Sequence, residues 1–169
     1  MTARRALVPA LVTLVALLLV AAGIVVLTRS NGGSGGDDAN GALVDQAETT
    51  QVIGQVSQAL DQVLSYDYAK PQATEQAATQ LLIGDAAAQY KTLFTALQDK
   101  AEGQQLTLAA STVVAGVSDL TSDHANLLVF LNQKSTRASD KATSTSAAQV
   151  QISATKVDGE WKISGLLAL

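Results

Sequence analysis

The sequence predicts an α+β domain in which helices come first along the chain and an antiparallel sheet follows. Up to about residue 103, apolar residues recur at spacings of three and four, the period of an amphipathic helix. Beyond that point the spacing changes to two, the period of a half-buried strand. Near the C-terminus, the pair Asp158-Gly159 is a strong signal for a tight hairpin turn. Helices followed by strands are the order of an α+β fold, and a curved sheet with covering helices suggests a cone.

The first helix is expected to begin at Asp45 and to run to about Tyr68. Asp45 and Glu48 resemble a capping pair at its start, and the Lys70-Pro71 step disfavours helix beyond its end. Its apolar face consists of residues at helical spacing, namely Val52, Ile53, Val56, Ala59, Leu60, Val63 and Leu64. We therefore expect this helix to bury one side against the sheet.

Two further helices are expected before the strands. One runs from Pro71 to about residue 83, because proline favours a first helical turn and Gly84 favours a left-handed cap at the end. The other runs from Asp85 to residues 102–103, with Tyr90 among its apolar positions. The sequence thus predicts three helices in this part of the chain.

Four strands are expected over residues 104–117, 125–131, 150–157 and 160–167. In the first of them the apolar alternation changes phase near Ser111-Thr112, which predicts a bulge or bend there. Residues 135–146 include seven Ser or Thr among twelve residues and no large apolar side chain, which predicts a mobile loop, either over the whole stretch or with strand ends at its margins. The sheet is therefore expected to have a long polar interruption between its second and third strands.

Residues 6–27 form an apolar run without a charged residue, which predicts a transmembrane helix. At ~1.5 Å per residue the run spans roughly 33 Å, close to the thickness of the hydrocarbon core. Arg4 and Arg5 before it favour a cytoplasmic tail at 1–5 and an exported C-terminal body. A glycine-rich flexible linker at 28–41 follows, and one domain occupies 42–169. A cleaved secretory signal is the competing interpretation, but the run continues beyond the only small-residue cleavage site.

Composition excludes several classes of function. The part from residue 42 onwards has eight Lys or Arg against thirteen Asp or Glu, a net charge of −5. That balance argues against nucleic-acid binding, which needs a basic surface to offset phosphate charge. The chain contains no cysteine, which excludes disulfides, thiol catalysis and cysteine zinc sites. We expect no metal and no cofactor.

Several residues are candidates for a site. Tyr66, Asp67 and Tyr68 form either a partner-recognition patch or a packed helix end. Trp161 either lines a lipid pocket or anchors the core through a hydrogen-bonded indole. Apolar residues that could line a pocket in the cone are Leu106, Leu108, Leu127, Val129 and Ile163, although the same spacing also describes an ordinary core.

One acid and base pair is a candidate catalytic site. His124, the only histidine, follows Asp123, and such a pair can transfer protons in an enzyme. No nucleophile elbow or spaced carboxylate motif accompanies it, so a solvent-facing polar turn is the favoured interpretation. We expect the protein not to be an enzyme.

Taken together, the order of these segments resembles the actinobacterial Mce-associated membrane proteins, which are single-span proteins accessory to Mce lipid transport systems. The resemblance covers nearly the whole chain and rests on the segments 64–68, 81–84, 115–117, 126–133 and 158–163 together with Tyr90. It treats Tyr66, Asp67, Tyr68, Gly84, Tyr90 and Trp161 as a partner or packing signature. The short tail and the glycine-rich linker depart from the family pattern, so contacts made through longer tails are not expected here.

The resemblance implies an exported domain with a fold similar to nuclear transport factor 2 (NTF2). It further implies a non-catalytic accessory subunit in a cell membrane, with Mce subunits and their permease as partners and lipid or sterol as the transported material. Two other functions stay open, namely a module that binds an apolar ligand in the cone and a VirB8-like secretion-system scaffold. An isomerase or dehydratase that depends on His124 is a further alternative.

Overall fold

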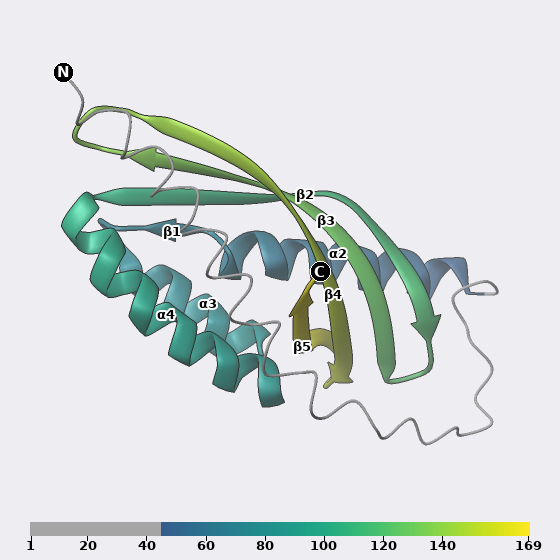
Figure 1. The fold of residues 1–169 in the computed structure, drawn as a ribbon. Helices are drawn as coiled ribbons and strands as arrows, with labels where there is room; N and C mark the ends of the chain where they lie inside the picture. Colours follow the sequence, from purple (N-terminus) through teal and green to yellow (C-terminus); the bar gives the residue numbers. More distant parts are fainter. Residues whose placement is uncertain (1–44) are drawn as a thin grey trace.

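The computed structural model describes residues 45–169, and the predicted membrane span and linker lie outside them (Figure 1). The described chain begins with three helices and a two-residue strand, and a long antiparallel sheet follows. Its elements are α2 (Gln46–Val63), β1 (Tyr66–Asp67), α3 (Pro71–Leu81), α4 (Gly84–Gln104), β2 (Leu106–Leu120), β3 (His124–Arg137), β4 (Thr143–Val157) and β5 (Glu160–Ala168). Figure 1 shows the sheet curling around the helices. The predicted α+β cone is confirmed.

Helix α2 begins as predicted but ends earlier. The Asp45 side chain accepts a hydrogen bond from the backbone N–H of Glu48 at 2.9 Å, which caps the first turn. The helix ends at Val63, and Leu64 forms its C-cap. The prediction that it continues to Tyr68 is wrong, because the next residues pair as strand β1 with β2. The two-residue strand therefore starts the sheet at residues for which the sequence predicts helix.

The connection from α3 to α4 depends on Gly84. Helix α3 ends at Leu81, two residues before the expected position, and the backbone N–H of Ile83 donates to the carbonyl of Ile163 at 2.9 Å. Gly84 then adopts a φ of +56° and is the first residue of α4. The left-handed conformation predicted for Gly84 is confirmed, but the glycine does not cap α3, whose C-cap is Leu82. Glycine adopts this φ without the strain that a side chain would bring.

The sheet has the strand order β1-β2-β3-β4-β5, and each neighbouring pair is antiparallel. The register of β2 with β3 shifts between Thr112 and Val114, which confirms the predicted bulge. Because the extra residue changes the parity, Val113 and Val114 are both exposed, whereas Ala115 again faces the helices. The phase change in the sequence is therefore a bulge in a continuous strand.

The strand ends allowed at the margins of residues 135–146 are confirmed, but a mobile loop over most of this stretch is wrong. Strand β3 continues to Arg137 and β4 begins at Thr143, so the pairing runs without a gap to Thr136 opposite Thr143. Only residues 138–142 form the turn. Backbone hydrogen bonds hold this hairpin and need no large apolar side chain, while threonine itself favours extended backbone.

The core has two parts. The larger cluster joins the buried faces of α2, α3 and α4 to the inner faces of β2 to β5, with Trp161 as its largest fully buried side chain. The smaller cluster lies where α4 meets β1 and the start of β2, and contains Tyr66, Phe94, Ala101, Leu106 and Leu108. The larger cluster is rich in alanine, valine and leucine, as the composition predicts, whereas the smaller one combines two aromatic rings with alanine and leucine.

Candidate functional site

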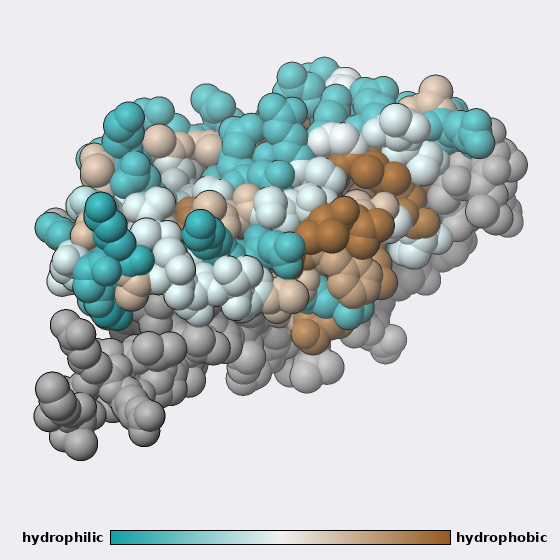
Figure 2. Space-filling view, turned by 90° about the horizontal axis from the view of Figure 1, so that it is seen from above, coloured by the Kyte–Doolittle hydropathy of each residue, from teal (hydrophilic) through white to brown (hydrophobic). Residues whose placement is uncertain are grey.

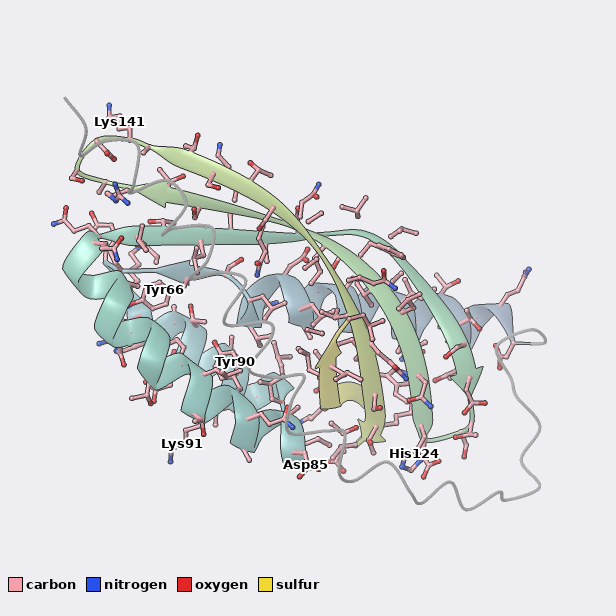
Figure 3. All side chains as sticks on the ribbon, viewed as in Figure 1. Tyr66, Asp85, Tyr90, Lys91, His124 and Lys141 are labelled. Carbon is pink, nitrogen blue, oxygen red and sulfur yellow. The ribbon has the colours of Figure 1, made fainter. Side chains whose placement is uncertain are left out.

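The tyrosines of the predicted recognition patch take different places in the structure. Tyr66 is buried, and its ring meets Phe94 edge-on at a centroid distance of 5.9 Å. Phe94 in turn stacks on Tyr90 at 5.6 Å, and Figure 3 shows Tyr66 and Tyr90 pointing between the helices and the sheet. Tyr68 is partly buried against the same cluster. Tyr66 is thus a packing residue of the core and does not form part of an exposed patch.

Tyr90 joins helix α4 to the end of helix α2. Its hydroxyl donates a hydrogen bond to the carbonyl of Val63 at 2.8 Å, in the last turn of α2. Carbonyls in a last helical turn have no partner within the helix, so this bond satisfies one of them. Burial, and then the negative charge of Glu75, raise the pKa of the Tyr90 hydroxyl above its usual value. Tyr90 is therefore a neutral donor at physiological pH.

A groove of about 330 Å³ lies where the end of α2, strand β1 and the start of α3 meet. It is lined by Gln62, Ser65, Tyr66, Asp67, Lys70, Ala73, Thr74, Ala77, Thr107 and Leu108. The Asp67 carboxylate accepts a hydrogen bond from the backbone N–H of Ala69 at 2.9 Å, so it shapes the turn at the rim. Of the predicted site residues, the groove brings together Tyr66, Asp67 and Leu108.

The five residues predicted to line an apolar pocket are divided between the two core clusters. Leu106 and Leu108 belong to the smaller cluster, whereas Leu127, Val129 and Ile163 belong to the larger one. All five side chains are buried. Only Leu108 contacts the groove described above, so these residues serve mainly as the core.

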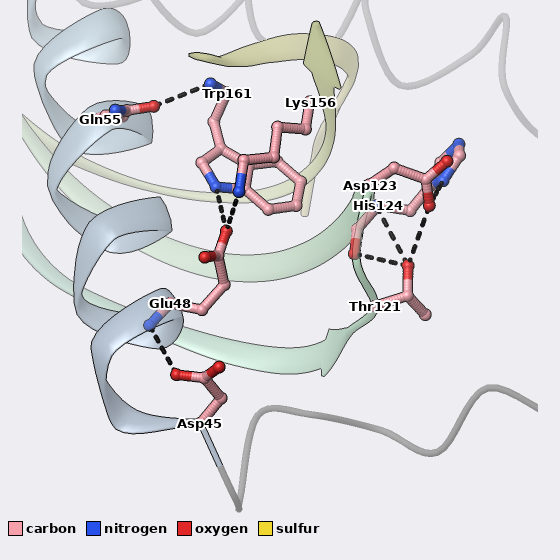
Figure 4. A network of polar contacts seen from close by, with 8 residues as sticks. All are labelled: Asp45, Glu48, Gln55, Thr121, Asp123, His124, Lys156 and Trp161. Carbon is pink, nitrogen blue, oxygen red and sulfur yellow. Dashed lines mark hydrogen bonds and ion pairs between the residues drawn. The ribbon is translucent and has the colours of Figure 1, made fainter. Parts of the chain in front are cut away.

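Trp161 is the centre of a polar network that ties the sheet to α2 (Figure 4). Its indole Nε1 donates to Glu48 Oε1 at 3.1 Å, and Lys156 Nζ lies 2.7 Å from the same oxygen. The Lys156 ammonium also lies 5.5 Å from the Trp161 ring centroid. The Trp161 backbone N–H donates to Gln55 Oε1 at 2.7 Å. Two residues of α2 therefore hold the β4–β5 hairpin.

Sequence reasoning missed Glu48, Gln55 and Lys156 as members of this network. The Trp161 and Glu48 partners are 113 positions apart in the chain, so no local spacing relates them. The only local pattern that involves Glu48 is its spacing from Asp45, and that pattern predicts helix capping alone. Glu48 in fact supplies its backbone N–H to the cap and its carboxylate to the hairpin.

The Asp123 and His124 pair lies on the exposed turn between β2 and β3 (Figure 4). His124 Nδ1 is 2.9 Å from Asp123 Oδ1, and the two side chains are 63% and 61% exposed. The hydrogen bond with His124 contributes most to lowering the pKa of the Asp123 carboxyl. Thr121 contacts both residues and closes the turn. The pair therefore stabilises a turn that faces solvent.

An apolar patch lies on the outer face of the sheet, away from the helices. Val113, Val114 and Phe130 are exposed by 60%, 55% and 41%, and Val114 pairs directly with Phe130 across β2 and β3. Figure 2 shows apolar side chains gathered on one part of this face, with hydrophilic residues around them. Exposed apolar patches of this kind recur at protein interaction sites.

Two negative findings apply to residues 45–169. No group of three or more His, Asp or Glu side chains in this part of the chain is arranged to hold a metal ion. None of its helices is long and apolar enough to cross a membrane.

Three long helices against a curled five-strand antiparallel sheet define an NTF2-like cone of the VirB8 type. An IcmL-like type IV secretion system protein from Legionella pneumophila is similar at 14% identity and a TM-score of 0.60, over 74% of this chain and 92% of that one. A periplasmic fragment of TraM is similar at 12% identity and a TM-score of 0.59, over 73% and 98%. VirB8 of Agrobacterium tumefaciens is similar at 10% identity and a TM-score of 0.57, over 74% and 94%.

These likenesses show the fold and leave the partners of this chain open. No family model and no curated protein matches the sequence. The resemblance to Mce-associated membrane proteins therefore stays a prediction, while the VirB8-like fold of residues 45–169 is shown.

Proposed function

We propose that this protein is a non-catalytic, membrane-anchored scaffold subunit of a secretion-type assembly in the cell envelope. The observation that carries the proposal is the agreement between residues 45–169 and VirB8-like domains over nearly the whole length of those domains. Three of the similar structures belong to proteins named for type IV secretion or as VirB8. A scaffold needs stable contact surfaces and no reactive centre, and the exposed residues Val114 and Phe130 provide such a surface.

The described side chains support a non-catalytic role. The His124 and Asp123 pair is exposed on a turn, whereas acid and base catalysts work at a site that positions a substrate. The buried tyrosines Tyr66 and Tyr90 pack on Phe94 and on the end of α2. The exposed patch around Val114 and Phe130 is a surface suited to protein contact.

The location follows from the sequence. Residues 6–27 anchor the chain in the cell membrane as a single span, with the tail at 1–5 in the cytoplasm. The glycine-rich linker at 28–41 connects this anchor to the exported domain. In this arrangement the domain works on the outer side of the membrane, in keeping with the similar fragment of TraM, which is periplasmic.

The Mce lipid or sterol import complex is the competing assembly, because the sequence resemblance implies it. The two assemblies are distinguished by purifying the full chain from its own membranes in mild detergent and identifying the proteins that accompany it. Enrichment of secretion-channel subunits is the expected result. Enrichment of Mce subunits and their permease would overturn the secretion assignment and replace it with the lipid-import one.

A matched control makes the purification specific to the exported domain. A chain that keeps residues 1–41 and carries an unrelated soluble domain in place of 42–169 retains the predicted anchor and linker. Partners that depend on the exported domain are lost from this control. If the same partners accompany both chains, the domain is not the scaffold and the proposal fails.

A further inference from the structure

Within residues 45–169, one edge of the first half of strand β4 is unpaired. Strand β5 pairs with β4 only from Val150 to Val157, and Leu169 lies beside Gln149. No described strand pairs with this side of residues 143–148, although β3 pairs along their other side. Figure 1 shows β4 extending well beyond β5. The edge therefore offers a row of backbone donors and acceptors to another strand.

One hydrogen bond identifies the residues whose backbone groups face this edge. The Leu169 N–H donates to the Gln149 carbonyl at 3.0 Å, so the backbone groups of Gln149 point toward the β5 side. In a strand the direction alternates at every residue. The N–H and C=O groups of Thr143, Thr145 and Ala147 therefore point to the open edge, and all three residues are exposed.

The other edges of the sheet are partly covered. On β2, the Thr112 N–H donates to the Asp61 carboxylate of α2 at 2.7 Å. On β5, the carbonyl of Ile163 accepts from the Ile83 N–H at 2.9 Å. Residues 143–148 contain no charged residue and no proline, the features with which edge strands commonly resist pairing.

We propose that the open edge of β4 pairs with the same edge of a second copy of this chain. The two edges run antiparallel about a twofold axis through Thr145. Thr145 then pairs with the partner's Thr145, and Thr143 pairs with the partner's Ala147. Each of the three edge-facing residues donates one hydrogen bond and accepts one, which is the self-complementary pattern that a twofold interface requires.

The side chains and charges fit this pairing. Residues 143–148 lie between the β3–β4 turn and Gln149, beside which β5 ends. In an antiparallel dimer the same six residues of each copy therefore face each other. Small side chains meet across the new ladder, and threonine pairs are favourable there. Lys134, opposite Thr145 on β3, is separated from the partner's Lys134 by three strand spacings of ~4.8 Å, beyond the screening length.

Cysteine cross-linking in the full chain tests the pairing, because the native sequence contains no cysteine. A hydrogen-bonded antiparallel pair has a Cα separation of ~5.5 Å, within the range of a disulfide. Thr145→Cys in native membranes treated with diamide is therefore expected to give a covalent dimer on a non-reducing gel. Thr143→Cys alone is the matched control, because its two copies are roughly 14 Å apart along the strands.

The register adds a second, stricter readout. Chains with Thr143→Cys co-expressed with chains with Ala147→Cys are expected to cross-link at least fivefold more than either chain alone. Equal cross-linking at all three positions, or none at Thr145→Cys, would overturn the proposal. In a double variant, Phe130→Thr added to Thr145→Cys is expected to leave the cross-linked dimer intact. A loss of cross-linking in this double variant would indicate that the copies meet through the outer face of the sheet instead.

A charge at the axis tests the interface without an oxidant. Thr145→Lys places two ammonium groups opposite each other, so the mass of the full chain in detergent is expected to fall from dimer to monomer. Thr145→Val keeps the backbone pairing and is expected to stay dimeric. A monomeric wild-type chain, or a Thr145→Lys dimer, would contradict the proposal. These results do not depend on which assembly accompanies the protein, so they are separable from the proposed function.

Discussion

Glu48 in the first turn of α2 accepts a hydrogen bond at 3.1 Å from the indole nitrogen of Trp161 in β5. The same carboxylate oxygen binds Lys156, so one side chain holds both strands of the β4–β5 hairpin. Trp161→Phe keeps most of the buried ring but removes the donor. We expect it to lower the free energy of unfolding by about 1 to 3 kcal/mol, measured by urea denaturation followed by circular dichroism. An unchanged unfolding midpoint would show that the bond is not made in solution.

The ion pair is predicted to contribute less than the indole bond. Glu48→Gln preserves an acceptor for Trp161 and removes only the charge, and both charged side chains are about one quarter exposed. We expect a loss of about 1 kcal/mol, reduced further at high salt. A double-mutant cycle with Lys156→Met isolates the pair, and strict additivity of the two single changes would contradict the contact.

The Tyr90 hydroxyl predicts a stability change at alkaline pH. Its pKa is raised in the folded state, so the unfolded chain releases this proton first. The stabilisation is therefore complete below pH ~10 and is lost above it by up to ~1.4 kcal/mol per pH unit. Tyr90→Phe is expected to flatten that part of the profile, at a cost near neutral pH of about 1 kcal/mol for the lost bond to Val63. An identical alkaline slope in both proteins would exclude Tyr90 as its source.

Neighbouring residues of β3 should differ in how much their substitution destabilises the domain. Leu131 is buried in the larger cluster, and Leu131→Ala is expected to cost about 2 to 5 kcal/mol. Phe130 faces outward from the next position, so Phe130→Thr is expected to cost less than about 1 kcal/mol. Comparing the two unfolding midpoints checks which face of β3 packs on the helices, and equal losses would contradict the register.

Two glycines provide a matched test of backbone conformation. Gly84→Ala is expected to destabilise by about 1 to 2 kcal/mol, because φ is +56° there although the space for a Cβ is adequate. Gly54 lies inside α2 with no heavy atom near an added Cβ, so Gly54→Ala is expected to stabilise by about 0.5 to 1 kcal/mol. Thermal unfolding gives both signs directly, and stabilisation by Gly84→Ala would refute the left-handed assignment.

The helices and the bulge were predictable because side-chain periodicity reports burial. The spacing of Val52, Val56 and Leu60 identifies the buried face of α2 without any knowledge of its partner. The phase change before Ala115 likewise locates the bulge, since adding one residue to a strand reverses the side chains that follow.

Features held by the backbone were not predictable in this way. Tyr66 and Asp67 belong to a strand too short to show alternation, and they follow a helix of similar apolar character. The hairpin around Thr136 and Thr143 carries few large side chains, so its composition resembles a loop although its backbone is paired throughout. Contacts between distant residues, such as Glu48 with Trp161, depend on the whole fold and leave no local pattern.

The position of the Glu48 contacts also has a mechanical consequence. Any tension applied at Asp45 enters the described domain at the first turn of α2, which contains Glu48. A helix pulled from its end would unwind one turn at a time if that turn were free. Here the load passes from Glu48 into the β4–β5 hairpin and is shared by the sheet. The domain would therefore resist pulling from its N-terminal end as one body.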